Sequence, residues 1–207
     1  MKHEWRKKEK GIYVPGNAPE IVEIPAYRFF TVSGEGDPNS EQFGEYIGVL
    51  YSLSYGVKMS PKKGMAPDGF HDYTVYPLEG VWDLREEARK DSAAGFSKED
   101  LVFTMMIRQP DFVDESFAMR ILGEMARKKP HPLLDQVRFE TLEEGKCVQM
   151  LHLGSYDSEP ESFRRMEEFA AGKGLTRLSK THREIYLSDP GKVASDKLKT
   201  VLRFRVE

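Results

Sequence analysis

Apolar residues follow two patterns along the chain, one with a period of two and one with spacings of three and four. Short runs rich in β-branched and aromatic residues are typical of strands, whereas spacings of three and four create the apolar face of a helix. The first pattern predicts strands at 21–35 with a break at Pro25, 72–76, 101–107, 137–141, 147–153, 181–188 and 198–206. The second pattern predicts helices at about 40–60, 114–128 and 159–172.

The order of these elements repeats along the chain. Segments 24–43 and 144–163 align with a shift of 120 residues, and each opens a run of strand, helix, strand and strand. Four of the twenty aligned positions are identical, so the shared order of elements is the stronger argument for a duplication. We expect an α+β fold of two strand-helix-strand-strand (SHS2-like) units, with internal repeats at about 20–110 and 135–207. Two like units predict pseudo-twofold symmetry around a central ligand cleft, because grooves of this kind commonly bind small molecules.

The first 19 residues are polar and are broken by glycine and proline. They predict a flexible N-terminal arm at 1–19 and a single domain at 20–207. The basic run of the arm consists of Arg6, Lys7, Lys8 and Lys10. A glutamate interrupts this run, and the whole chain has a formal net charge of −3. Domains that bind nucleic acids usually show a basic stripe, so we expect no direct nucleic-acid binding.

Cysteine usage and hydropathy indicate the compartment. The chain has one cysteine, Cys147, which excludes an intrachain disulfide and fits a reducing environment. Its mostly apolar surroundings favour a buried small side chain over a nucleophile. The sequence has no run of about 18 apolar residues and no apolar segment behind the N-terminal charges, so it predicts neither a membrane span nor a signal peptide. We expect a cytoplasmic protein without membrane contact.

Cofactor motifs are not found in the sequence. The five histidines are scattered and lack the spacing of a metal site. Gly34 and Gly36 follow a predicted strand, but the third glycine of a dinucleotide fingerprint is missing. The chain contains neither a phosphate loop nor a Gly-x-Ser-x-Gly elbow. We therefore expect no cofactor and no bound metal.

Several longer motifs resemble a known family. They are GEGDPN at 34–39, LYSLSY at 50–55, PLEGVW at 77–82, LGSYDSEP at 153–160, HREIYLSDP at 182–190 and KLKTVLR at 197–203. In this order they resemble the stand-alone GyrI-like small-molecule-binding proteins, and the resemblance covers about residues 20–207. It implies two strand-helix-strand-strand units with pseudo-twofold symmetry around a central cleft.

The resemblance also implies candidate activities. In many relatives the domain is the drug sensor of a transcription regulator with a helix-turn-helix module, but about twenty residues ahead of the domain leave no room for such a module here. A stand-alone subfamily that this chain resembles includes hydrolases that open the cyclopropane of spirocyclopropyl-cyclohexadienone DNA alkylators. Those enzymes use an aromatic cage in the same cleft and have an acidic residue on the strand that carries HREIY.

The alternation of the 182–188 strand selects a candidate catalytic group. With a period of two, Ile185 and Leu187 face one way, and His182, Glu184 and Tyr186 face the other. A carboxylate between aromatic side chains is partly desolvated, which raises its pKa and suits it to accept a proton from water or to attract a cation. The competing interpretation is a surface glutamate on a solvated strand face.

Large rings elsewhere are candidates for ligand contacts. We predict that the ligand-binding residues are Tyr51, Trp82, Tyr186, Phe103 and Met105, and that the catalytic residues are Glu184, Tyr55 and His182. The rings offer rigid contact area for planar or cationic ligands. Tyr55 or His182 would donate to a developing oxyanion. A position in the core is an equally good interpretation for Tyr51 and Tyr55.

Three functions remain open at this stage. The first is hydrolysis of cyclopropane-bearing alkylators as a detoxification reaction. The second is non-catalytic binding or sequestration of planar hydrophobic or cationic small molecules. The third is a protein-interaction role, such as inhibition of a topoisomerase, which depends on fold-level analogy alone.

Overall fold

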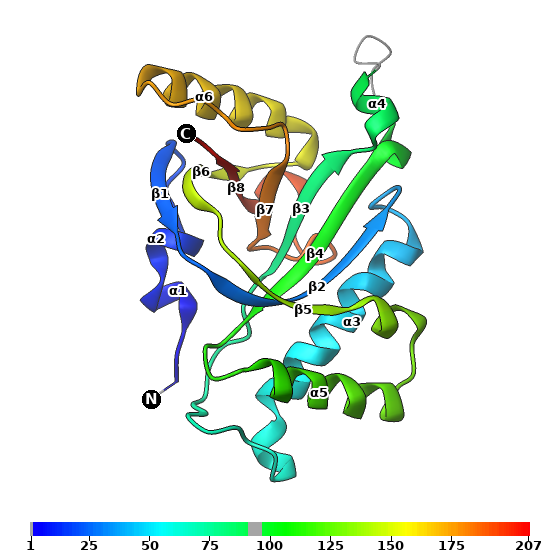
Figure 1. The fold of residues 1–207 in the computed structure, drawn as a ribbon. Helices are drawn as coiled ribbons and strands as arrows, with labels where there is room; N and C mark the ends of the chain where they lie inside the picture. Colours follow the sequence, from blue (N-terminus) through cyan, green and yellow to red (C-terminus); the bar gives the residue numbers. More distant parts are fainter. Residues whose placement is uncertain (1, 91–96) are drawn as a thin grey trace. The chain divides into compact units, whose positions relative to one another are not determined.

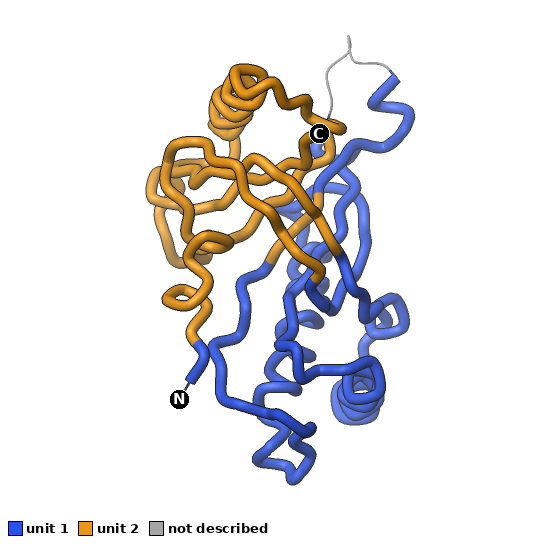
Figure 2. The backbone as a smooth tube through the Cα atoms, turned by 60° about the vertical axis from the view of Figure 1, so that its left-hand side comes forward, with its two compact units in different colours: residues 1–3, 27–78, 82–142 blue, residues 4–26, 79–81, 143–207 orange. Residues whose placement is uncertain are grey.

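The structure, a computed structural model, describes residues 2–90 and 97–207. It forms two compact units, which Figure 2 colours separately. Unit 1 consists of Met1–His3, Tyr27–Leu78 and Trp82–Leu142. Unit 2 consists of Glu4–Ala26, Glu79–Val81 and Glu143–Glu207.

Unit 1 contains antiparallel strands with helices packed on them (Figure 1). Its strands are β2 (Tyr27–Glu35), β3 (Leu78–Leu84), β4 (Leu101–Gln109) and β5 (Arg138–Leu142), with the order β3-β4-β2-β5. Of β3, residues Glu79–Val81 belong to unit 2. Its α-helices are α3 (Glu41–Lys58), α4 (Glu86–Lys90) and α5 (Glu115–Lys128). Its 3-10 helices are η1 (Ser60–Lys63), η2 (Lys98–Asp100) and η3 (Pro132–Gln136). The long helix α3 packs on β2 and β4, and α5 packs on α3.

Local sequence signals explain where the helices of unit 1 begin. The Ser40 hydroxyl accepts a hydrogen bond from the Phe43 backbone N–H at 3.2 Å, and Asp114 accepts one from Phe117 at 2.7 Å. Both are standard N-cap contacts that satisfy otherwise unpaired donors of the first turn. Behind these caps, the apolar faces of the elements make a core in which Leu50 is fully buried. Among the described residues, no helix combines the length and the apolar character that crossing a membrane requires.

Unit 2 contains four strands, which pair in antiparallel fashion, and one long helix. Its strands are β1 (Glu20–Ile24), β6 (Gly145–Leu153), β7 (His182–Tyr186) and β8 (Lys199–Arg205), with the order β1-β6-β8-β7. Its helices are α1 (Trp5–Lys8), α2 (Lys10–Tyr13), α6 (Glu159–Gly172) and the 3-10 helices η4 (Tyr156–Ser158) and η5 (Ser195–Lys197). Helix α6 packs on β6, and the apolar core includes Val148, Met150, Met166, Leu202 and Phe204.

The N-terminal segment differs from the flexible arm that the sequence predicted. Helices α1 and α2 bury Trp5 and Tyr13, whose ring centroids are 5.4 Å apart. Arg203 of β8 donates to the Ile12 carbonyl at 2.8 Å, and Gln149 of β6 donates to the Gly11 carbonyl at 2.7 Å. The many charged residues around the two buried rings made the segment look solvated, although its backbone is bonded to the sheet.

The two units share an order of elements. Unit 1 runs β2-α3-β3-β4 and unit 2 runs β6-α6-β7-β8, so strand, helix, strand and strand recur in each. The orders in which the strands neighbour one another, β3-β4-β2 and β7-β8-β6, also correspond. The predicted α+β class is confirmed. The predicted strand at 72–76 is wrong: Tyr73 forms only an isolated bridge to His3, and the strand lies further along the chain at β3.

Candidate functional site

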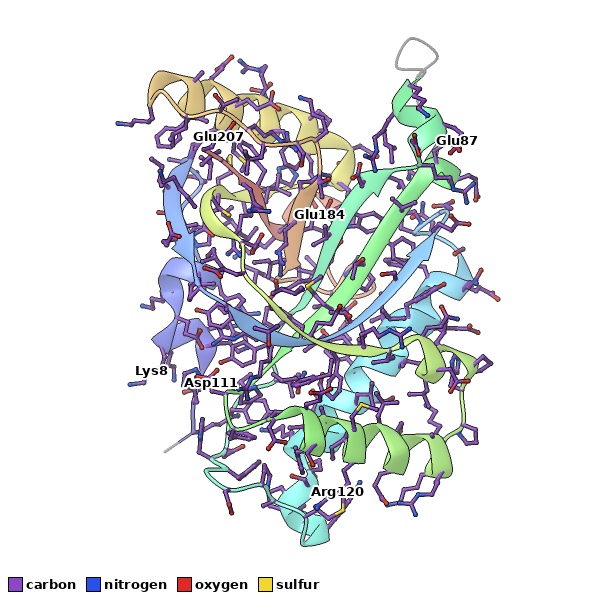
Figure 3. The ribbon with its side chains drawn as sticks, in the orientation of Figure 1. Lys8, Glu87, Asp111, Arg120, Glu184 and Glu207 are labelled. Atoms are coloured by element: carbon purple, nitrogen blue, oxygen red, sulfur yellow. The ribbon has the colours of Figure 1, made fainter. Side chains whose placement is uncertain are left out.

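The strand β7 presents a glutamate between two polar rings, as its alternation predicted. Glu184 is 8% exposed and accepts a hydrogen bond from the Tyr186 hydroxyl at 2.8 Å. The His182 Nε2 atom lies 3.1 Å from the other Glu184 oxygen. Figure 3 labels Glu184 on β7. The interpretation of this residue as a solvated surface glutamate is wrong, because its carboxylate is buried and bonded within unit 2.

A second carboxyl group, which the sequence analysis missed, meets Glu184. Glu159 is the first residue of α6 and is 6% exposed. Burial raises its pKa well above the usual value of 4.5, and the nearby charge of Glu184 and a side-chain hydrogen bond to it add to the increase. Two buried carboxyl groups in contact cannot both ionise at neutral pH, so the pair retains one proton. We assign that proton to Glu159, which then donates to the Glu184 carboxylate.

Tyr156 adds a phenol beside this pair. Its ring meets the ring of Tyr186 edge-on, with centroids 6.2 Å apart. Burial raises the pKa of Tyr156 to about 12, and the charges of Glu184 and Glu159 contribute. The phenol therefore remains protonated at neutral pH and is a donor for any negative charge that develops near it. Its position on η4, directly ahead of α6, links it to the segment that carries Glu159.

The opposite face of β7 is held by buried charges. Arg183 lies 2.6 Å from a Glu79 oxygen and 3.0 Å from a Glu144 oxygen, and Glu144 also pairs with Arg203 at 2.9 Å. All four side chains are almost completely buried in unit 2. Removing one partner from such a network leaves an uncompensated buried charge, which is strongly destabilising. The network therefore fixes the position of the strand that presents Glu184.

The predicted aromatic residues of unit 1 fall into two groups. Trp82 is 6% exposed and packs against Phe103 and Phe43, with ring centroids 5.3 Å and 5.8 Å away. Phe103 is buried, and Met105 on the same strand is completely buried. Their part in ligand binding remains a prediction, since these positions also serve the core.

Tyr51 and Tyr55 of α3 form the second group. Their ring centroids are 6.4 Å apart, as the four-residue spacing predicted. Tyr55 is 52% exposed, so a core position is excluded for this residue. The structure thus brings together Glu184, His182 and Tyr186 in unit 2, and Tyr51 with Tyr55 and Trp82 with Phe103 in unit 1.

Other chemistry has little support in the described residues. Residues 2–90 and 97–207 contain no group of three or more histidine, cysteine or acidic side chains arranged to hold a metal ion. Cys147 is fully buried, and burial raises the pKa of its thiol to about 12, with a further contribution from Glu144. A thiol with such a pKa is a poor nucleophile at neutral pH.

Comparisons with solved structures give close matches over the full length of the chain. A hydrolase from Listeria innocua is 33% identical with a TM-score of 0.89, and the match covers 100% of both chains. A second structure of a hydrolase from Listeria innocua is 34% identical, with the same TM-score and coverage. The EcmrR C-terminal domain shares the fold at 16% identity, with a TM-score of 0.51 and coverage of 91% of this chain and 96% of that one. The search of curated proteins finds no match.

The family model is consistent with these structures. A model described as the GyrI-like small molecule binding domain matches residues 17–207. That range includes every element of the site in unit 2, from η4 through β7, and every aromatic residue predicted in unit 1. The chain belongs to the GyrI-like small molecule binding domain family.

Proposed function

We propose that this protein hydrolyses planar, hydrophobic xenobiotics that carry an electrophilic carbon, with Glu184 as the general base. The observation that carries the proposal is the buried carboxyl pair of Glu159 and Glu184. A pair that retains one proton presents a carboxylate, which accepts a proton, next to a neutral carboxyl group, which donates a hydrogen bond. Two similar structures from Listeria innocua are described as hydrolases, which supports the reaction class but names no substrate.

The proposed substrates are the spirocyclopropyl-cyclohexadienone alkylators that the family resemblance implies. Glu184 takes a proton from a water molecule while the water oxygen bonds to a cyclopropane carbon. The ring carbon–carbon bond breaks, and its electron pair converts the dienone into a phenolate. The phenolate then takes up a proton, so the net change is the addition of one water. General base assistance of this kind is worth about 10²–10⁴-fold in rate.

The remaining residues of the site have supporting roles in this scheme. The Tyr186 hydroxyl bonds to one Glu184 oxygen and so orients the carboxylate. Tyr156, whose phenol stays protonated, is a donor for the developing phenolate, and His182 is a second donor. Tyr55 was predicted as such a donor and remains a candidate. The rings of Tyr51, Trp82, Phe103 and Tyr186, with Met105, are the proposed ligand contacts.

The test uses a spirocyclopropyl-cyclohexadienone compound and mass spectrometry of the product. The protein should convert the compound into a product heavier by one water, and Glu184→Gln should lower turnover about 10²–10⁴-fold. Glu161→Gln is the matched control, because Glu161 is an exposed carboxylate on the first turn of α6 that pairs with Arg164. Full activity of Glu184→Gln would contradict the role of Glu184 as the base.

The second candidate function is binding without turnover. It is favoured by the carboxylate of Glu184 beside two aromatic side chains, an arrangement that also attracts organic cations. In that case the compound would be retained by the protein but recovered unchanged. Loss of retention in Glu184→Gln for cationic but not for neutral compounds would then identify the carboxylate as a charge partner.

The pseudo-twofold symmetry, the central cleft and the repeat boundaries at about 20–110 and 135–207 remain predictions. Their support is the shared order of strand, helix, strand and strand within each unit. Detoxification is the biological role that hydrolysis of an alkylating compound would serve.

A further inference from the structure

His152 is a buried histidine near the end of β6 that has no part in the proposed reaction. It is 4% exposed. Its Nδ1 atom lies 2.9 Å from the Ser162 hydroxyl oxygen. Its Nε2 atom lies 3.0 Å from the Ser155 carbonyl oxygen and 3.3 Å from the Ser158 hydroxyl oxygen. One imidazole ring thus contacts three serines of the segment that follows β6.

The Ser155 carbonyl group decides which ring nitrogen carries the proton. A carbonyl oxygen only accepts hydrogen bonds, so Nε2 of His152 donates to it. In the neutral ring, Nδ1 then accepts from the Ser162 hydroxyl. The Ser155 oxygen has two lone pairs and also accepts from the Ser158 hydroxyl at 2.7 Å. Each of these hydrogen bonds therefore joins a donor to an acceptor.

The start of α6 lacks the cap that begins the long helices of unit 1. Ser40 and Asp114 each accept a hydrogen bond from a backbone N–H of the first turn. Ser158 is the N-cap residue of α6, but its side chain makes no such bond, because its hydroxyl donates to the Ser155 carbonyl instead. The hydrogen bonds of His152 therefore anchor the start of this helix from outside it.

The anchored segment carries two residues of the site. Tyr156 lies between Ser155 and Ser158, and Glu159 directly follows Ser158 and lies three residues ahead of Ser162. The contacts of the imidazole ring thus lie on both sides of Glu159 along the chain. Since they start from β6, they fix the Glu159 backbone relative to the strands of unit 2.

We propose that His152 is a positioning residue of the carboxyl pair, which holds the start of α6 on β6 so that the Glu159 side chain stays buried against Glu184. Its meaning for catalysis rests on the proposed function. The carboxyl pair itself is a property of the ligand-free protein, so its state can be measured without any substrate.

The pKa of Glu159 reports on this position. Burial raises the pKa above 4.5, and the charges of Glu184 and Asp157 and a hydrogen bond to Glu184 add to the increase. Tyr156 also faces Glu159, and its phenol stays protonated. If the start of α6 moves away from β6, water enters and the two carboxyl groups separate, and both changes return the pKa toward 4.5. A general loss of stability without movement at this site changes neither.

The experiment follows the Glu159 carboxyl signal by ¹³C NMR of the ligand-free protein over pH, with the signal assigned by its loss in Glu159→Gln. His152→Phe keeps a ring and removes both hydrogen bonds. In this variant the apparent pKa of Glu159 should fall by about one pH unit, the tenfold change in an equilibrium that one or two net hydrogen bonds are worth. His152→Gln keeps a donor near the position of Nε2, so its pKa should lie between those of the wild type and His152→Phe.

Val148→Ala is the matched control. Val148 lies on the same strand and belongs to the apolar core with Met166 of α6, so the variant lowers stability but keeps every hydrogen bond of His152. The pKa of Glu159 should equal the wild-type value in this variant. An unchanged pKa in His152→Phe would overturn the proposal, and so would an equal fall in Val148→Ala or in His152→Gln.

Ser162→Ala provides the second test if His152→Phe does not fold. It removes only the hydroxyl that bonds to Nδ1 and should lower the pKa of Glu159 by a smaller amount. No fall in Ser162→Ala would then overturn the proposal. A fall in these variants, together with a wild-type protein that does not turn over a spirocyclopropyl-cyclohexadienone compound, would support the role of His152 and count against the hydrolase function alone.

Discussion

Corresponding positions of the two units differ in their chemistry. In each unit a phenylalanine near the start of the long helix contacts the third element of the strand-helix-strand-strand run. Phe43 of α3 packs on Trp82 of β3 at 5.8 Å, whereas Phe163 of α6 packs on His182 of β7 at 4.7 Å. Around Trp82 the contacts are further rings, and around His182 they are a buried carboxylate and a backbone carbonyl.

The identical glycines of the two repeats, Gly34 and Gly154, also have different structural roles. Gly34 lies inside β2, where an added Cβ atom would come within 2.7 Å of the rings of Phe103 and Tyr46. Gly154 follows β6 with a φ of 128°, a value that side-chain-bearing residues rarely adopt. One glycine makes room for aromatic packing and the other permits a turn. Similar architecture thus supports an apolar cluster in unit 1 and a titratable site in unit 2.

Truncation of Trp82 should give the largest effect on stability. Trp82→Ala removes a buried ring from the cluster with Phe43 and Phe103, and such changes cost about 3–5 kcal/mol. His182→Ala at the corresponding place should cost about 1 kcal/mol, as expected for one lost hydrogen bond. Urea unfolding followed by circular dichroism measures both values, and Trp82→Phe serves as the control that keeps a ring. Equal losses for the two alanine variants would contradict the contrast between the units.

The carboxyl pair of unit 2 should make the stability of the protein depend on pH. The pKa of Glu159 is raised in the folded protein above its usual value of 4.5. Between these two values the folded protein binds a proton that the unfolded chain has lost, so the free energy of unfolding falls as pH rises. The slope approaches at most about 1.4 kcal/mol per pH unit for one group. Glu159→Gln should flatten the dependence of stability on pH between about pH 5 and 8.

Glu161→Gln is the control for this titration. Glu161 lies on the same turn of α6, and its hydrogen bond to Arg164 lowers the pKa of its carboxyl group. This group is therefore already ionised throughout the range, and the variant should retain the wild-type slope. Urea unfolding at several pH values provides the measurement. A slope that Glu159→Gln leaves unchanged would show that the pair does not retain its proton.

The sequence predicted those parts of the site that depend on local periodicity. Alternation along β7 correctly placed His182, Glu184 and Tyr186 on one face, because a strand reverses its side chains at every residue. Glu159 was missed because its role depends on where the start of α6 packs. The only sequence signal was a glutamate ahead of Pro160 in a motif of the family, and helix starts are commonly acidic without being buried.

Dependence on tertiary contacts also explains why the sequence wrongly predicted a flexible N-terminal arm and a strand at 72–76. Trp5 and Tyr13 lie in helices of four residues each, which are too short for a periodic signal. Their segment is bonded through the carbonyls of Gly11 and Ile12 to Gln149 and Arg203, which lie far along the chain. The run at 72–76 has the composition of a strand but forms only one bridge, at Tyr73. A high β-strand propensity indicates only that a segment could pair with another strand. Tertiary contacts decide whether a partner strand lies beside it.

The smallest expected effect comes from replacing the two phenylalanines, Phe43 and Phe163. The pair of variants distinguishes a loss of ring packing from a change at His182. Phe43→Leu and Phe163→Leu each keep an apolar side chain and lose one aromatic pair, worth about 0.5–1.5 kcal/mol beyond the buried area. Both variants should therefore unfold at slightly lower urea concentrations. Only Phe163→Leu should also shift the ¹⁵N NMR signals of the His182 imidazole in the ligand-free protein, because only this ring packs on the imidazole that contacts Glu184. A change of equal size in Phe43→Leu would mean that the state of His182 follows general stability and not the contact on α6, and the distinction between the two units would then be one of composition alone.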